Sequence, residues 1–337
     1  MSTIPVIDIE PLFECKGSSK VAVAKSIRAV CEKYGFFQIV NHGISHSIID
    51  KMTDEALRFF RLPLDEKLKF AVRKWNSANA NEYRGYFPSS INGKESFDVG
   101  SPYLAKSHPL VVSRDPLHEL NKWPTEQLGE EWKTTIQLYW DEMWRLSMLI
   151  MRALALSFDL DEFYFDHLLD DRSTGGAGTE STFRLNFHPQ RDDSTSVSID
   201  DDGQKLSCET HINGCILTIL YQHKVGGLQV ETEPNTWTSV DVMPCAFVVN
   251  TGKWLERWTN SVLKAVNHRV ILLKEEQLLA PFFLQACHST PISSLQTIVD
   301  KQNSQKDDSI NSESCITESN EEFNEYRREP HIEQDDE

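Results

Sequence analysis

The sequence lacks several features that would place it in a specialised protein class. No apolar run reaches the roughly 18 residues of a transmembrane helix, and no basic region followed by an apolar one opens the chain. The seven cysteines are scattered, odd in number and without a Cys-x-x-Cys pair. This usage predicts reduced thiols in a cytoplasmic protein and gives no sign of a zinc site.

Positive charge is also scarce. The 337 residues contain 34 Lys/Arg against 51 Asp/Glu, a net charge of −17. Nucleic acid and anionic membrane surfaces would be repelled, so we expect neither as a partner. A hydrophobic content of 39% fits a globular protein with a sizeable core.

The acidic charge is concentrated at the C-terminal end of the chain. Residues 288–337 contain 13 Asp/Glu against 4 Lys/Arg and are rich in Ser, Asn and Gln. Such a segment cannot bury enough apolar surface to order itself. We predict a disordered, solvated tail, and the alternative is a tail that docks onto a protein partner.

Before the tail, the pattern changes from helices to short strands. Residues 1–115 contain two strands, two amphipathic helices and a loop-rich part over 71–115. A long support helix is predicted over 125–157, with a buried stripe of Leu138, Met143, Leu146, Ile150 and Leu154. Strands are predicted at 183–188, 216–221, 228–232, 246–250, 265–273 and 281–285, with a polar hairpin loop over 191–207. The fold class is mainly β with flanking helices, as a sandwich or jelly roll.

Two histidines stand near the ends of the stretch from residue 209 to residue 270. A strand-borne His-x-carboxylate pair and a distant second His build the facial site that binds non-haem Fe(II). Here the pair reads His211-x-Asn213, and the second residue is His268. Asn213 offers a carbonyl oxygen without charge, so we expect weakened Fe(II) binding. The alternative is that Asn213 hydrogen-bonds to His211 or to the backbone in an empty site.

Motifs distributed over residues 3–287 make a family resemblance specific. They include residues 34–44, 184–186, 226–230, 248–252 and 268–270. With them the chain resembles the isopenicillin N synthase-like branch of the Fe(II)/2-oxoglutarate oxygenases. The resemblance implies a double-stranded β-helix core over 116–287, a helical N-terminal region over 1–115, and a metal site of His211, Asn213 and His268.

The resemblance also places a co-substrate pocket. Family members anchor 2-oxoglutarate with Arg-x-Ser, which here reads Gln277 and Leu279, and with Asn-x-Tyr, which reads Asn186 and His188. Gln and Leu would leave the dicarboxylate charge unpaired, so we expect 2-oxoglutarate to bind poorly or not at all. His188 is either a third nitrogen ligand or a packed or solvent-facing residue.

The mouth of this pocket is the last part of the predicted site. Glu95 and Asp98 are expected to line it, or else to be simply solvated. Two functions remain open, and neither assigns a catalytic residue. The first is a non-haem iron-dependent oxygenase or oxidase that acts on an unknown small organic molecule. The second is a catalytically inactive oxygenase-fold protein that serves as a binding or regulatory module.

Overall fold

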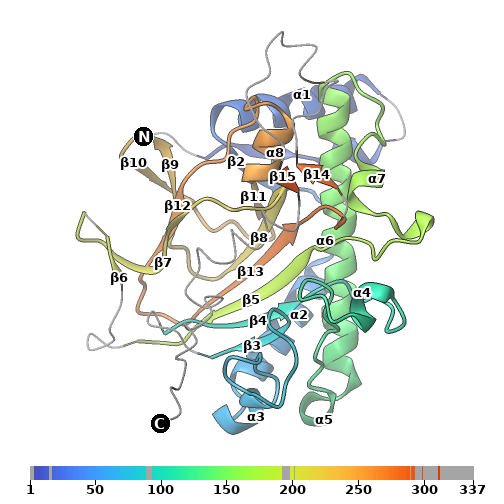
Figure 1. The fold of residues 1–337 in the computed structure, drawn as a ribbon. Helices are drawn as coiled ribbons and strands as arrows, with labels where there is room; N and C mark the ends of the chain where they lie inside the picture. Colours follow the sequence, from blue (N-terminus) through green and yellow to red (C-terminus); the bar gives the residue numbers. More distant parts are fainter. Residues whose placement is uncertain are drawn as a thin grey trace, which may run out of the picture.

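The computed structural model describes residues 4–14, 17–88, 93–191, 198–200, 202–288, 290–292, 298 and 310–311. Two β-sheets face each other, and helices cover one side (Figure 1). The larger sheet contains, in spatial order, β1 (Val6–Asp8), β2 (Phe36–Val40), β11 (Phe247–Thr251), β8 (Leu217–His223), β13 (Gln277–Leu284), β5 (Thr182–His188), β4 (Glu95–Val99) and β3 (Gly85–Phe87). The smaller sheet contains β10 (Thr236–Ser239), β9 (Leu228–Glu233), β12 (His268–Ile271), β7 (Lys205–His211) and β6 (Ser198–Ile199). The predicted fold class is confirmed.

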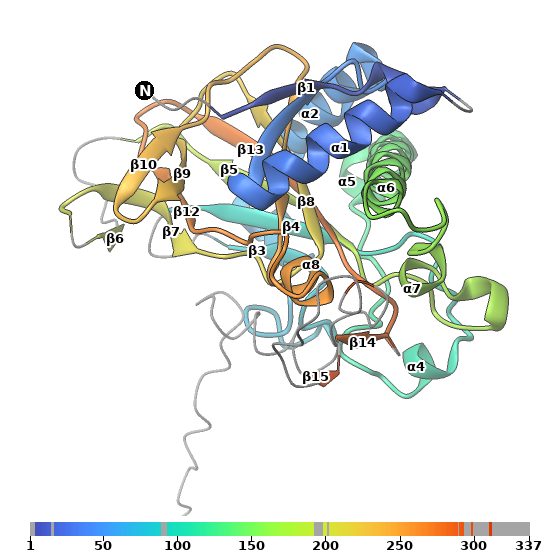
Figure 2. The same cartoon turned by 90° about the horizontal axis from the view of Figure 1, so that it is seen from above.

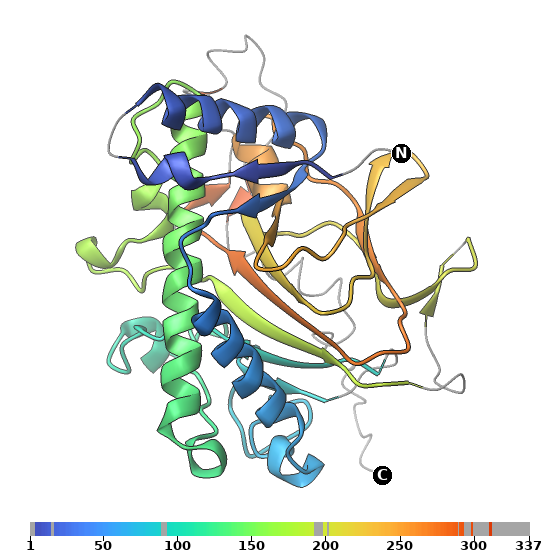
Figure 3. The ribbon, with the colours of Figure 1, turned by 180° about the vertical axis from the view of Figure 1, so that it is seen from behind.

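The long helices lie on the side of the larger sheet that faces away from the smaller one (Figures 2 and 3). These are α1 (Ser18–Lys33), α2 (His46–Phe60) and α6 (Glu130–Ser157). Shorter helices are α3 (Leu64–Leu68), α4 (Pro109–Val112), α5 (Thr125–Leu128), α7 (Asp166–Leu169), α8 (Lys253–Trp258), η1 (Glu10–Phe13) and η2 (Arg172–Thr174). None of the helices in the described ranges is both long and apolar enough to cross a membrane.

The support helix has the predicted stripe with one error. Met143, Leu146, Ile150 and Leu154 are fully buried, whereas Leu138 is 44% exposed. At 3.6 residues per turn, Leu138 is turned well away from Met143, five positions later, so both cannot face the sheet. The predicted helix is also divided, because Gly129 adopts φ +82° between α5 and α6.

The predicted loop-rich part over 71–115 contains two strands, β3 and β4. β4 pairs with β5 although it carries two acidic residues, Glu95 and Asp98. Asp98 is 1% exposed and bonds to Arg184 at 2.6 and 2.7 Å, and Glu95 pairs with Lys67 at 2.5 Å. The alternative that these carboxylates are simply solvated was therefore wrong for Asp98, which is buried in its ion pair, whereas the expectation that they line a pocket mouth stays a prediction.

A small apolar cluster lies between the two sheets. It joins side chains from the larger sheet and its N-terminal edge to side chains of the smaller one: Ile4, Phe36, Leu228, Val230, Val240, Val248, Val270 and Leu279. The larger cluster lies between the helices and the larger sheet. Most of the predicted disordered tail, 288–337, is outside the described residues, which there include the pair β14 (Pro291–Ile292) and β15 (Ile310–Asn311).

Candidate metal and co-substrate site

Strand pairing brings the two predicted histidine ligands together. β12 runs antiparallel to β7, and the register sets His268 opposite His211. The centroids of the two imidazole rings are 4.2 Å apart, with 53° between the ring planes. His268 is only 6% exposed. Two residues that are distant in the sequence thus form one pair of nitrogen donors.

Hydrogen bonds orient both rings in the same way. Nδ1 of His211 lies 2.7 Å from the carbonyl oxygen of Glu209, and Nδ1 of His268 lies 3.3 Å from that of Val266. A carbonyl only accepts, so in the neutral form of each ring Nδ1 carries the hydrogen and Nε2 has the lone pair. Metal-binding histidines use this arrangement, with the second nitrogen held by an outer partner.

The two histidines differ in their affinity for protons. Burial, and the neighbouring His211, hold the pKa of His268 well below its ordinary value, so His268 is neutral. Burial also disfavours protonation of His211. The thiol of Cys208 and the carbonyl of Glu209 outweigh this effect and raise the pKa of His211. The neutral imidazole, which is the form of His268, is the form that binds a metal.

Asn213 is buried just beyond the end of β7. Its Nδ2 donates to Oγ1 of Thr218 on β8 at 2.8 Å. The hydrogen bond found for the side chain thus goes to neither His211 nor the backbone, the two partners considered from the sequence. The amide is oriented by Thr218, and only its Oδ1 is left to face a cation.

The predicted co-substrate residues are brought together on β5 and β13. The register sets Gln277 opposite His188 and Leu279 opposite Asn186. Gln277 is 2% exposed, and its Nε2 donates to the carbonyl of Gly226. Leu279 belongs to the apolar cluster between the sheets, and Oδ1 of Asn186 accepts from Ser96 at 2.7 Å.

His188 is a packed residue. It is 3% exposed, and its Nδ1 lies 3.3 Å from Nη2 of Arg191. The solvent-facing alternative was therefore wrong. A role as a third metal ligand stays a prediction, and Nδ1 already has the guanidinium as its neighbour.

Sequence reasoning missed two buried cations near these residues. Arg191 is 9% exposed, and its Nε and Nη1 are buried without a hydrogen-bond partner among the described residues. Burial lowers the pKa of Arg191. Lys94 is 8% exposed, and its charge opposes protonation of His211. Arg191 starts the stretch that was predicted as a polar hairpin loop, and no local pattern distinguishes it there.

Comparisons with known proteins agree with this architecture. Residues 4–126 match the family described as non-haem dioxygenase in morphine synthesis, N-terminal, and residues 179–286 match the 2OG-Fe(II) oxygenase superfamily. A full-length Neurospora crassa protein solved in complex with alpha-KG is similar in structure, with a TM-score of 0.75 at 25% identity. The match covers 94% of this chain and 95% of that one.

Curated relatives match along most of the chain. Isopenicillin N synthase of Amycolatopsis lactamdurans is 34% identical over 293 residues, which cover 86% of both chains. Isopenicillin N synthase of Penicillium rubens is 31% identical over 288 residues, covering 84% of this chain and 85% of the relative. The chain therefore belongs to the 2OG-Fe(II) oxygenase superfamily, in its isopenicillin N synthase-like branch.

Proposed function

We propose that this chain is a non-haem iron-dependent oxidoreductase that acts on a small organic anion and makes little or no use of 2-oxoglutarate. The observation that supports this most is the adjacent pair of imidazoles, each of which directs Nδ1 to a backbone carbonyl and so leaves Nε2 as the metal-binding nitrogen of the neutral ring. His211, His268 and Oδ1 of Asn213 would hold Fe(II). Iron bound there supplies a centre with open positions for O2.

Asn213 makes the affinity of this site for iron lower than that of a site with two histidines and a carboxylate. Its amide oxygen is neutral, whereas a carboxylate would offset part of the charge of the ion. Thr218 holds the amide, so the side chain has no second donor atom for the metal. Asp at this position has the same length and accepts a hydrogen bond from the Thr218 hydroxyl.

Anaerobic Fe(II) titration of the wild type and of Asn213→Asp tests the iron site. We expect weak binding of one ion per chain in the wild type and binding about tenfold tighter, or more, in the variant. His268→Ala is the control and should bind no iron at this site. Equal affinities in the wild type and in His268→Ala would contradict the proposed ligand set.

The co-substrate pocket offers no charge where relatives of this branch are expected to carry one. Gln277 uses its amide to bond Gly226, and Leu279 packs among Val230 and Val270. A carboxylate pushed against these groups would lose its hydration without gaining a partner. Calorimetric titration with metal present should therefore show no micromolar affinity for 2-oxoglutarate. A micromolar dissociation constant would refute this part of the proposal.

The positive charge for an anionic ligand would instead come from Arg191, at the start of the loop that follows β5. The Arg191 guanidinium keeps Nε and Nη1 unbonded, and it lies against His188, which faces Gln277 across the strand pair. Lys94 adds a second positive charge, which is close enough to His211 to oppose its protonation. A guanidinium fork with two open donors matches a carboxylate.

Binding of simple carboxylates tests the role of Arg191. Acetate and benzoate, which carry one carboxylate each, are the probes, and thermal shift and calorimetry are the readouts. We expect at least one of them to bind the wild type and to lose about tenfold or more in affinity in Arg191→Met. Arg61→Met, which removes an exposed guanidinium paired with Glu276, is the matched control and should change nothing.

The second candidate function is a non-catalytic binding module. It is favoured by the same packing of Leu279 and Gln277, because a fold that keeps its pocket can bind a ligand without chemistry. Oxygen consumption by the iron-loaded chain separates the two candidates. Carboxylate binding without iron uptake, in the wild type and in Asn213→Asp alike, would favour the module.

A further inference from the structure

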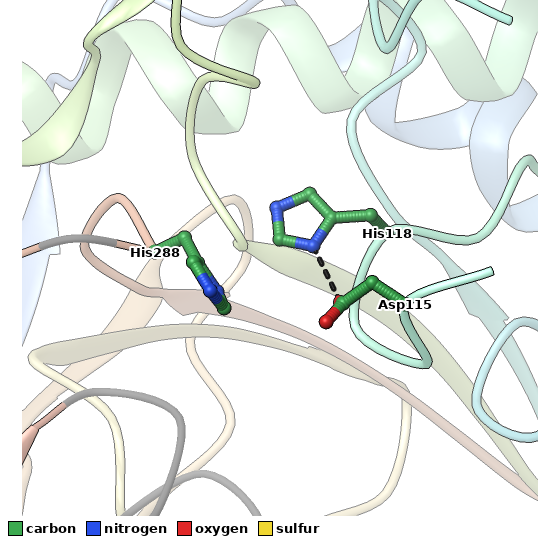
Figure 4. A group of neighbouring side chains, drawn as sticks. All are labelled: Asp115, His118 and His288. Carbon is green, nitrogen blue, oxygen red and sulfur yellow. Dashed lines mark hydrogen bonds and ion pairs between the residues drawn. The ribbon is translucent and has the colours of Figure 1, made fainter. Parts of the chain in front are cut away.

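A second group of histidines and carboxylates lies apart from His211 and His268. Asp115 and His118 belong to the loop between α4 and α5, and His288 follows β13. Their ligand atoms lie within 4.8 Å of one another, and Figure 4 shows His288, from one segment, beside Asp115 and His118, from another. Glu180, just before β5, joins them, with its Oε1 2.9 Å from Nδ1 of His288.

The backbone holds these segments in place independently of any ligand. Thr179 forms a β-bridge with Cys287, and the amide of Glu180 donates to the carbonyl of Ala286 at 3.1 Å. These bonds set Glu180 beside His288. Oδ1 of Asp115 accepts from the amide of Leu117 at 3.0 Å, which fixes the turn that carries His118.

Asp115 determines which nitrogen of His118 is free. Its Oδ1 lies 2.7 Å from Nδ1 of His118. The carboxylate accepts, so Nδ1 carries the hydrogen and Nε2 keeps a lone pair. A carboxylate that holds the outer nitrogen of a histidine in this way is the usual second partner of a metal-binding imidazole.

The free atoms of the cluster are buried and unsatisfied. His118 is 4% exposed and Glu180 is 5% exposed. Within the described ranges, Nε2 of His118 and Oε2 of Glu180 have no hydrogen-bond partner. Nε2 also lies 3.8 Å from Oε1 of Glu180, which is too far for a hydrogen bond even if the ring were protonated. A cation between them would satisfy both acceptors.

The donor set selects the kind of cation. Two imidazoles and a carboxylate suit zinc or a similar divalent transition metal, whereas magnesium and calcium prefer oxygen alone. Tetrahedral ligands at zinc distances are about 3.3 Å apart. The distance of 3.8 Å from Nε2 of His118 to Oε1 of Glu180 is slightly longer than that value. Asp115 and His118 line a cavity of about 710 Å³, through which an ion can arrive.

We propose that His118, His288 and Glu180 bind a divalent zinc-type ion, with Asp115 as the positioning residue that orients His118. The ion joins three segments that are distant in the sequence and anchors the end of β13, where the acidic tail begins. This site is independent of the proposed iron site, because it shares no residue with it.

Metal content of the full chain tests the site. A His211→Ala/His268→Ala background removes the candidate iron site. After equilibrium dialysis against micromolar zinc, we expect one zinc per chain to remain in this background. Co(II) substitution should give visible absorption bands typical of four-coordinate nitrogen and oxygen ligands.

Two conservative variants and one control locate the ion. Glu180→Gln and His288→Gln, made in the same background, should each weaken zinc binding by about tenfold or more. His108→Gln is the control, because its ring stacks 6.4 Å from that of His118 outside the ligand set, and it should bind zinc normally. Circular dichroism confirms that each variant folds. A background chain that takes up no zinc, or variants that bind like their parent, would overturn the proposal.

Discussion

At the scale of single residues, Arg184 and Arg191, two of the buried arginines, differ in whether their guanidinium groups have partners. Arg184 makes a bidentate pair with Asp98, and its side chain is 8% exposed. Arg191 is buried to a similar degree, yet two of its nitrogens have no hydrogen-bond partner in the part of the chain that the structure describes. An unpartnered buried charge lowers stability, and the anionic ligand that we propose for Arg191 would offset this cost.

Replacing each arginine by methionine should therefore change stability in opposite directions. Arg191→Met should raise the free energy of unfolding by about 1 kcal/mol, because it removes buried N–H donors for which the described residues supply no acceptor. Arg184→Met should lower it by about 3–5 kcal/mol, because Asp98 would be left buried and unpaired. Urea denaturation of the ligand-free proteins measures both. A loss of stability in Arg191→Met would show that the residue is structural.

His42 is a second residue whose surroundings define its chemical state. Its Nε2 donates to the carbonyl of Cys245 at 2.7 Å, and its Nδ1 accepts from the amide of Ile44 at 3.2 Å. Only the neutral ring can do both. Burial is the main cause that lowers the pKa of His42 below its ordinary 6.5, and the charges of His46 and Arg145 act in the same direction.

The pH dependence of stability follows with a definite sign. Between the lowered pKa of folded His42 and the ordinary value of 6.5, the unfolded chain binds a proton on His42 and the folded chain does not. The free energy of unfolding therefore falls as the pH drops below 6.5 towards the folded pKa. His42→Gln abolishes this contribution, and the stability difference between wild type and variant should shrink as the pH falls. Denaturant unfolding at several pH values measures the difference. A difference that is independent of pH would contradict the assignment.

At the scale of elements, α6 illustrates what local periodicity can and cannot predict. Its apolar spacing predicted a long helix with one buried face, and four of the five stripe residues are buried. The error at Leu138 arose because a Leu can occur on either face of a helix. β4 was missed because its acidic residues depend on Arg184 and Lys67, partners that no local pattern reveals.

Two leucines of α6 form a matched pair for testing this packing. Leu146→Ala should cost about 2–5 kcal/mol, because it leaves a cavity in the core beneath the larger sheet. Leu138→Ala should change the free energy of unfolding by less than about 0.5 kcal/mol, since that side chain is 44% exposed. Both variants keep the helix propensity comparable, so thermal or urea unfolding compares burial alone. Equal effects would contradict the observed orientation of α6.

At the scale of the whole molecule, the apolar interior is unequally divided. The large cluster joins the long helices to the larger sheet, and the small one lies between the two sheets. The smaller sheet, which carries both His211 and His268, depends on the small cluster. Regions with few buried apolar contacts open most readily, so this sheet should be the more dynamic part.

Amide hydrogen exchange should reveal this division. Amides of β7, β9 and β12 should exchange faster than those of β5, β8 and β13, and Fe(II) should slow exchange in β7 and β12 if it binds where we propose. His268→Ala serves as the control and should show no response to iron. Uniform exchange rates across both sheets would contradict the expected difference in stability.

The sequence by itself determined the fold class, the spacing of His211 and His268, and the absence of the expected carboxylate and arginine at Asn213 and Gln277. These features are carried by local periodicity and by residue identity, which can be read along the chain. Only the tertiary structure decided that Thr218 orients Asn213 and that Arg191 is buried. It also decided that Glu180 meets His118 and His288. The physical reason is that strand register and loop packing join residues distant in sequence, and burial then determines which of their polar atoms remain without a partner.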